Sequence, residues 1–174
     1  TTVWTVASVP LQVGANSISA SATDLAGNSG QVLLTIHRDN TPPLVSITTP
    51  ASDPFATGAS SEFISGTASD AVLLSTVTWS NNRGGSGACA IIGGNWNIAP
   101  NPPGLVTGLS PGLNVITVTA TDAAGNTTTD TVTINYDTTP PAVAFSTPAA
   151  GTVNQNPTID ATGSASDNVA LAGV

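Results

Sequence analysis

The aspartates are the residues of this sequence whose type and spacing best suit chemistry. The chain has 174 residues with 10 acidic side chains against 2 basic ones, for a formal charge of −8. Calcium is bound in proteins by about six to eight oxygen atoms, which carboxylates and backbone carbonyls supply. Five aspartates recur in phase, and we predict that they hold calcium at two successive points of the chain: Asp39, Asp70 and Asp122 at the first, Asp137 and Asp167 at the second.

A purely structural role for the aspartates is the competing interpretation. Asp24 and Asp122 each begin a turn, DLAGN and DAAGN, whose backbone N–H groups a carboxylate caps. Asp70 and Asp167 would then only start loops. The sequence also has no ligand-dense string of the EF-hand kind. Both interpretations stay open on the sequence alone.

The tryptophans are candidates for carbohydrate binding. Flat rings such as those of Trp79 and Trp96 stack on sugars when they are exposed. Trp79 stands in the pattern VTW, however, where sandwich domains carry a core tryptophan, and Trp96 recurs as Trp4. Packing in or beside the core is therefore the alternative for both residues.

The residue types that catalysis needs are scarce. His37 is the only histidine, it stands beside a linker, and no nucleophile elbow occurs. Cys89 is the only cysteine, so it either cross-links to a neighbouring chain or serves as a small buried apolar residue. We expect no enzymatic activity.

The charge balance excludes several partners. Phosphate binding needs clustered cations, and only Arg38 and Arg83 are basic, so we expect no nucleic acid partner. No apolar run is long enough to cross a bilayer, so we expect no membrane insertion. A chain rich in Thr, Ser, Asn and Gly is typical of secreted proteins, and we expect an extracellular or cell-surface location.

The candidate aspartates and tryptophans lie in an internal repeat, whose fold determines where they are placed. Residues 23–50 and 121–148 are similar, and Asp24 and Asp122 are 98 residues apart (122 − 24). An immunoglobulin-type sandwich has about 100 residues. The sequence therefore predicts an all-β chain of tandem immunoglobulin-like β-sandwich repeats with a period near 98 residues.

Alternating residues predict the strands. In Asn114–Thr121, Ile116, Val118 and Ala120 share one face, and Val132 and Ile134 continue the pattern in the next strand. Further strands are predicted over 44–48, 62–68, 76–79, 89–92, 95–98 and 105–109.

Two linkers of the form Asp-x-Thr-Pro-Pro, at 39–43 and 137–141, divide the chain. They predict the C-terminal part of one repeat over 1–43, a complete repeat over 44–141 and the N-terminal part of a further repeat over 142–174. The chain is then either a window on a longer repeat protein, or a subunit whose incomplete repeats are completed by neighbouring chains.

The string NVITVTATDAAGNTTTDTVTINYDTTPP, with ISGTASD and VTWSNN before it, resembles the Ig-like repeats of bacterial surface adhesins and modular secreted proteins. The resemblance implies a structural segment of an extracellular stalk, adhesin or filament, its joints stiffened by calcium. Neighbouring Ig-like repeats or identical subunits would be the partners, with cell-surface glycans as a further class. The alternatives are an accessory carbohydrate-binding or spacer module of a secreted polysaccharide-active enzyme, and a subunit of a strand-exchanged extracellular filament.

Overall fold

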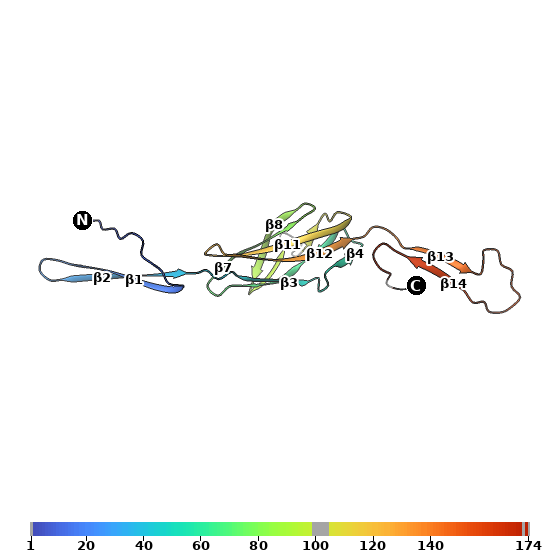
Figure 1. The fold of residues 1–174 in the computed structure, drawn as a ribbon, viewed down its shortest axis with the longest axis horizontal. Coiled ribbons are helices and arrows are strands. Elements are labelled where there is room, and N and C mark those ends of the chain that lie inside the picture. The colour runs from blue at the N-terminus through green and yellow to red at the C-terminus, as the bar shows by residue number, and fades with distance from the viewer. Residues whose placement is uncertain (1, 99–104, 172, 174) are drawn as a thin grey trace.

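The computed structural model describes residues 2–98, 105–171 and 173. Every regular element in this part of the chain is a β-strand, as predicted. The described residues contain no helix that is long and apolar enough to cross a membrane. The strands form a central sandwich with one isolated hairpin at each end of an elongated molecule (Figure 1).

The central sandwich contains ten strands. They are β3 (Leu44–Thr49), β4 (Phe55–Thr57), β5 (Ser61–Phe63), β6 (Ser65–Ser69), β7 (Leu74–Asn81), β8 (Ser86–Ile92), β9 (Asn95–Ile98), β10 (Leu105–Thr107), β11 (Gly112–Asp122) and β12 (Thr127–Tyr136).

Eight of these strands run in the order β3-β6-β9-β8-β7-β11-β12-β4. Strand β8 links two layers, because Cys89–Ile92 pair with β9 while Ser86–Ala88 pair with β7. One layer is thus β3-β6-β9 and the other is β7-β11-β12-β4, and the pairing of β12 with β4 is parallel. This arrangement, with β3, β6 and β9 in one layer and β7 and the β11–β12 hairpin in the other, is that of an immunoglobulin-like sandwich.

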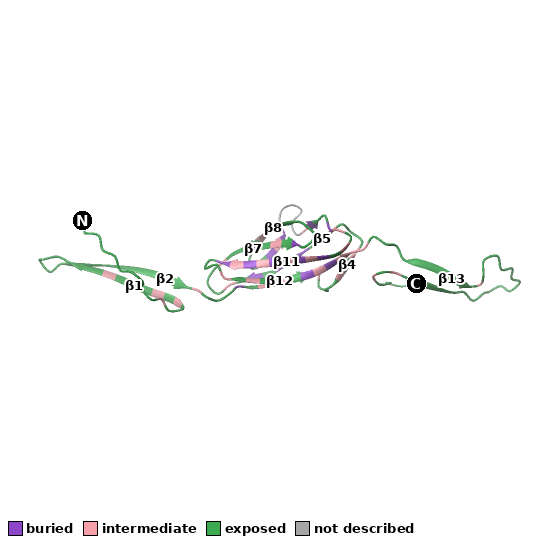
Figure 2. Ribbon diagram, turned by 45° about the horizontal axis from the view of Figure 1, so that its top comes forward, coloured by how far each residue is buried: buried purple, intermediate pink, exposed green. Residues whose placement is uncertain are grey.

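The core lies between the two layers, as the buried stripes in Figure 2 show. Ile116, Val118 and Ala120 are fully buried, and Val132 and Ile134 lie beside them in the same core. The inward faces predicted from the alternation are confirmed. Apolar β-branched side chains fill this core because they suit the pleated surface of a sheet.

The strand predictions erred at two places. Residues 62–68 form two strands, β5 and β6, which belong to different sheets and are separated at Ile64. Strand β4 was not predicted, because Phe55–Thr57 is a short edge segment next to Pro54 with no alternation to reveal it.

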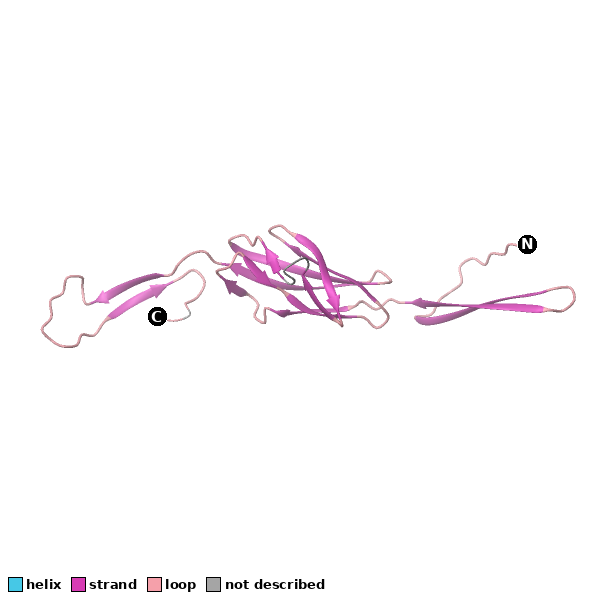
Figure 3. Ribbon diagram, turned by 180° about the vertical axis from the view of Figure 1, so that it is seen from behind, coloured by secondary structure: helices cyan, strands magenta, loops and turns pink. Residues whose placement is uncertain are grey.

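The flanking hairpins repeat parts of the sandwich. Strands β1 (Gly14–Thr23) and β2 (Ser29–Arg38) pair from Gly14 with Arg38 to Thr23 with Ser29, and β11 and β12 pair in the same register from Gly112 with Tyr136. Strands β13 (Ala142–Thr147) and β14 (Thr162–Ser166) repeat β3 and β6, including the bulge. The view from behind shows both hairpins without covering strands (Figure 3).

Candidate functional site: an aspartate cluster at the joint

Asp39, Asp70 and Asp122 meet where the first linker enters the sandwich. Each offers one carboxylate oxygen, and these oxygens all lie within 4.8 Å of one another. The residues come from the linker after β2, the loop after β6 and the end of β11. Three predicted ligands that are distant in sequence are therefore neighbours in space.

Asp122 is held by the turn that it begins. Its Oδ1 accepts hydrogen bonds from the N–H groups of Ala124 (2.8 Å) and Asn126 (2.9 Å), and its Oδ2 accepts one from Nδ2 of Asn126 (2.8 Å). Burial opposes ionisation, but the bonds from Asn126, Ala124 and Gly125 outweigh it and lower the pKa of Asp122. A carboxylate accepts at about four lone-pair positions, so this cap leaves room for a further ligand.

Asp70 has one oxygen without a partner. Its Oδ1 accepts hydrogen bonds from the N–H groups of Val72 and Leu73, both at 2.8 Å. Its Oδ2 is buried and has no hydrogen-bond partner among the described residues. A buried acceptor that is left unsatisfied costs about 1–3 kcal/mol, and more when it is charged. This oxygen is the feature of the cluster that a turn or loop does not explain.

Asp39 brings the linker into the cluster. Its Oδ1 accepts a hydrogen bond from the N–H of Thr41 at 2.9 Å, and Pro43 of the same linker is fully buried.

The two arginines bind backbone carbonyl oxygens. Arg38, which precedes Asp39 in the sequence, donates from Nη1 to the carbonyl oxygen of Leu11 at 3.1 Å. The other arginine, Arg83, donates to the carbonyl oxygen of Pro111 at 3.4 Å. Neither basic group is thus directed to the three carboxylates.

The spacing of the oxygens suits a single hard cation. Calcium binds oxygen at about 2.3–2.6 Å, so two oxygens on one ion lie no more than about 5.2 Å apart. The separation in the cluster, 4.8 Å at most, is within that limit. Three carboxylates and nearby backbone carbonyls are the ligand types that calcium prefers.

At the second joint two of the three carboxylates recur, because Asp137 corresponds to Asp39 and Asp167 corresponds to Asp70. Oδ1 of Asp137 accepts from the N–H of Thr139 (3.0 Å) and from Nδ2 of Asn168 (3.1 Å). Both bonds lower the pKa of Asp137, and the bond from Thr139 has the larger effect. Asp167 accepts from the N–H of Val169 at 2.9 Å, and its Oδ2, like that of Asp70, is buried and has no partner among the residues that the structure describes. Among the described residues, no counterpart of Asp122 joins this pair.

The structure places the two candidate sugar-binding tryptophans differently. Trp96 is 1 % exposed, and its Nε1 donates to the carbonyl oxygen of Thr67 at 3.0 Å, so its ring is not available to a sugar. The prediction of a stacking role for Trp96 does not fit this geometry, because the ring fills the space above Gly66. Trp79 is half-buried, with its ring close to Gly85.

His37 and Cys89 lie apart from the aspartate cluster. His37 is exposed on β2, where it pairs with Ala15. Cys89 is half-buried on β8 and packs against the core, and burial raises the pKa of its thiol to about 11. A thiol with this pKa is almost entirely protonated at neutral pH, which makes it a poor nucleophile.

Sequence reasoning missed Asn114. This residue is fully buried, and its Nδ2 donates to the carbonyl oxygens of Ser110 (2.8 Å) and Gly112 (2.9 Å) while its Oδ1 accepts from the N–H of Ser110. Asn16 makes the same pattern of bonds with Gln12 and Gly14. The signal was present, because Gly-x-Asn occurs in both copies, but a recurring string alone does not reveal which side chain is buried.

Comparison with known proteins gives a limited result. No family model and no curated protein matches the sequence. Among solved structures, the chain is similar to the fibronectin(III)-like modules of Clostridium thermocellum CbhA, with 24 % identity and a TM-score of 0.43. The match covers 73 % of this chain and spans 64 % of the length of that chain. The immunoglobulin-like fold is assigned here from the chain's own strand order and connections.

Proposed function

We propose that this chain is a structural segment of an extracellular stalk, adhesin or filament, and that calcium stiffens the joints between its repeats. The observation that carries the proposal is the meeting of three carboxylates at the linker, one of which keeps a buried oxygen that has no hydrogen-bond partner in the described part of the chain. A cation bound there would connect the linker to two loops of the following sandwich, and so would restrict rotation about the joint.

The composition supports an extracellular structural role. A formal charge of −8 with only 2 basic residues leaves most carboxylates without protein counter-charges, so cations from the medium must balance them. Calcium is abundant outside cells, where binding sites with dissociation constants of about 0.1–1 mM suffice. Fold alone does not specify function, so the joint, rather than the sandwich, carries the argument.

Isothermal titration of calcium into the whole chain tests the proposal. We expect one site at the first joint and at least about tenfold weaker binding in Asp70→Asn, which removes the negative charge and replaces one of the two carboxylate oxygens by an NH2 group. At a free calcium concentration about a hundredfold above the dissociation constant, the wild-type sandwich should gain about 2.7 kcal/mol of stability.

Asp24→Asn is the matched control. Asp24 accepts the same turn hydrogen bonds as Asp122, from Ala26 (2.9 Å) and Asn28 (2.8 Å), but it lies outside the cluster. Its substitution should leave calcium affinity unchanged. If Asp70→Asn and Asp24→Asn bind calcium as the wild type does, the joint is not the binding site and the proposal fails.

The carbohydrate-binding alternative has weaker support. Of the two tryptophans predicted to stack on sugars, Trp96 is buried and Trp79 is partly covered. We therefore favour the spacer role over the sugar-binding one.

A further inference from the structure

Strands β4 and β12 lie where tension along the chain would cross the central sandwich. The first linker continues into β3 and then into β4, and β12 continues into the second linker. The two linkers leave the sandwich at opposite ends (Figure 1). In a stalk under tension, β4 is therefore pulled toward the first joint and β12 toward the second, and the bonds between these strands carry the tension across the repeat.

The two loaded strands pair in parallel. The pairing runs from Phe55 opposite Ile134 to Thr57 opposite Tyr136, and the N–H of Asp137 donates to the carbonyl oxygen of Thr57 at 2.9 Å. Opposed forces along two parallel strands slide one strand past the other. Because the hydrogen bonds of a parallel pair are evenly spaced along the strands, they all resist this sliding at once. The pair is thus loaded in shear.

Two aspartates extend this connection beyond the paired residues. Oδ1 of Asp53 accepts a hydrogen bond from the N–H of Thr133 at 2.9 Å, and Oδ2 of Asp130 accepts one from the N–H of Ile47 at 2.7 Å. Each bond joins β12 to the segment that precedes β4. A hydrogen bond with a carboxylate acceptor is about twice as strong as a neutral one. Strand β12 is therefore tied to the beginning of the repeat from residue 130 to residue 137.

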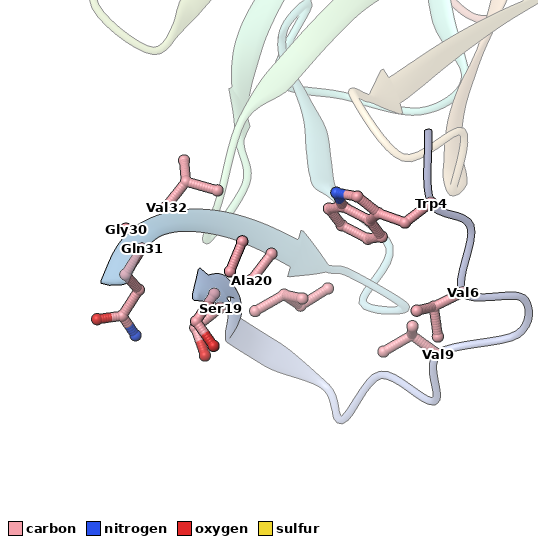
Figure 4. Close-up of a pocket in the computed structure, with 11 residues that line it drawn as sticks. Trp4, Val6, Val9, Ser19, Ala20, Gly30, Gln31 and Val32 are labelled. Atoms are coloured by element: carbon pink, nitrogen blue, oxygen red, sulfur yellow. The ribbon is translucent and has the colours of Figure 1, made fainter. Parts of the chain in front are cut away.

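The first hairpin shows the contrasting geometry. Gly14 at the start of β1 pairs with Arg38 at the end of β2, so tension on the chain separates the two strands from that end. Their hydrogen bonds then break one pair after another. Trp4, Val6 and Val9 of the preceding arm turn toward this hairpin and line an apolar pocket with it (Figure 4). Within the described residues, however, β2 pairs with β1 alone.

We infer that β4, β12 and the two aspartate bonds form a mechanical clamp, by which the sandwich resists tension along the stalk. This load-bearing function rests on the proposed stalk for the direction of the force. It does not rest on calcium, since none of the clamp bonds involves Asp39, Asp70 or Asp122. The cation stiffens the first joint, whereas the clamp keeps the repeat folded when the joint is pulled.

Single-molecule force spectroscopy of the whole chain in excess EGTA tests the clamp. With the chain held at its two ends, we expect the hairpins to open at low force and the sandwich to unfold in one step at a higher force. Forced unfolding is governed by the unfolding rate. Asp53→Ala and Asp130→Ala should each raise this rate at a fixed force by about tenfold or more, because each removes a hydrogen bond to a charged group. The double variant should unfold fastest.

Val77→Ala is the matched control. Val77 is 1 % exposed on β7, so its truncation opens a cavity in the core but removes no bond between β4 and β12. Urea unfolding measures the equilibrium stability of every variant. Val77→Ala should lose at least as much equilibrium stability as Asp130→Ala, yet its unfolding rate under force should change less.

Two results would overturn the clamp. In the first, the aspartate variants unfold under force at the wild-type rate. In the second, the rates under force follow the equilibrium stabilities, with Val77→Ala the most affected. A calcium titration of the same samples separates this inference from the proposed joint, since a chain that binds no calcium but resists force in this way would refute the joint and support the clamp.

Discussion

At the scale of single residues, polar groups with several partners hold the irregular parts of the sandwich in place. Asn114 connects the loop before β11 to the strand, because it accepts from Ser110 and donates to Ser110 and Gly112 while fully buried. Asp122 does the same for the turn after β11. These residues bind backbone groups of the loop and the turn, which the strand ladders leave unpaired.

Substitution of Asn114 by Ala should destabilise the sandwich by about 3 kcal/mol, since it leaves several partly buried backbone groups without this partner and opens a small cavity. Urea unfolding followed by tryptophan fluorescence measures the loss. Asn16→Ala removes the same bonds from the exposed first hairpin and should change the midpoint little. Equal effects of the two substitutions would contradict the assignment.

At the scale of elements, the close packing of β6 against β9 depends on a residue without a side chain. Gly66 lies between the carbonyl oxygen of Ser46 and the ring of Trp96, and an added Cβ would overlap the first and come within 2.6 Å of the second. The first layer of the sandwich therefore requires glycine here, although the backbone of Gly66 needs no left-handed conformation.

Gly66→Ala should cost about 3 kcal/mol or more, because neither a backbone carbonyl nor a buried indole moves easily. Thermal unfolding monitored by near-ultraviolet circular dichroism, which reports on Trp96, measures the loss. Gly58→Ala is the control, since its Cβ would meet only the carbonyl oxygen of Asp137 at 3.9 Å. A Gly66→Ala variant as stable as the Gly58→Ala variant would show that β6 and β9 can separate without cost.

At the scale of the whole molecule, the joints decide how far the chain reaches. The hairpins and the sandwich follow one another along one axis (Figure 1), and two proline-containing linkers separate them. Proline fixes one backbone angle per residue but leaves the others free, so the aspartate cluster is the further restraint available at the first joint.

Small-angle X-ray scattering with calcium and with EGTA measures this restraint. We expect calcium to narrow the distribution of molecular dimensions and to increase the largest one, because a cation that ties the linker to the sandwich excludes bent arrangements. Asp39→Asn, which alters the linker ligand alone, should remove the effect of calcium. The measurement is made at low concentration, so that association between molecules does not contribute. Identical profiles with and without calcium would contradict a stiffened joint.

The sequence by itself determined the features that depend on neighbouring residues. Alternation of apolar residues in β11 and β12 predicted the inward faces of Ile116 and Ile134, because side chains along a strand alternate between two faces. The recurring Asp-x-Ala-Gly-Asn string predicted the hairpin turns for a similar reason, since the turn is built from consecutive residues.

Only the tertiary structure decided which distant residues meet. Asp39, Asp70 and Asp122 are in phase in the sequence, but their mutual distance depends on the linker, the β6 loop and the β11 turn arriving at one end of the sandwich. The burial of Trp96 likewise depends on Gly66, 30 residues earlier (96 − 66), and the division of β8 between two layers depends on its pairing with β7 at one end and with β9 at the other. Local patterns specify each strand and turn, whereas contacts between layers follow from the packing of all strands at once.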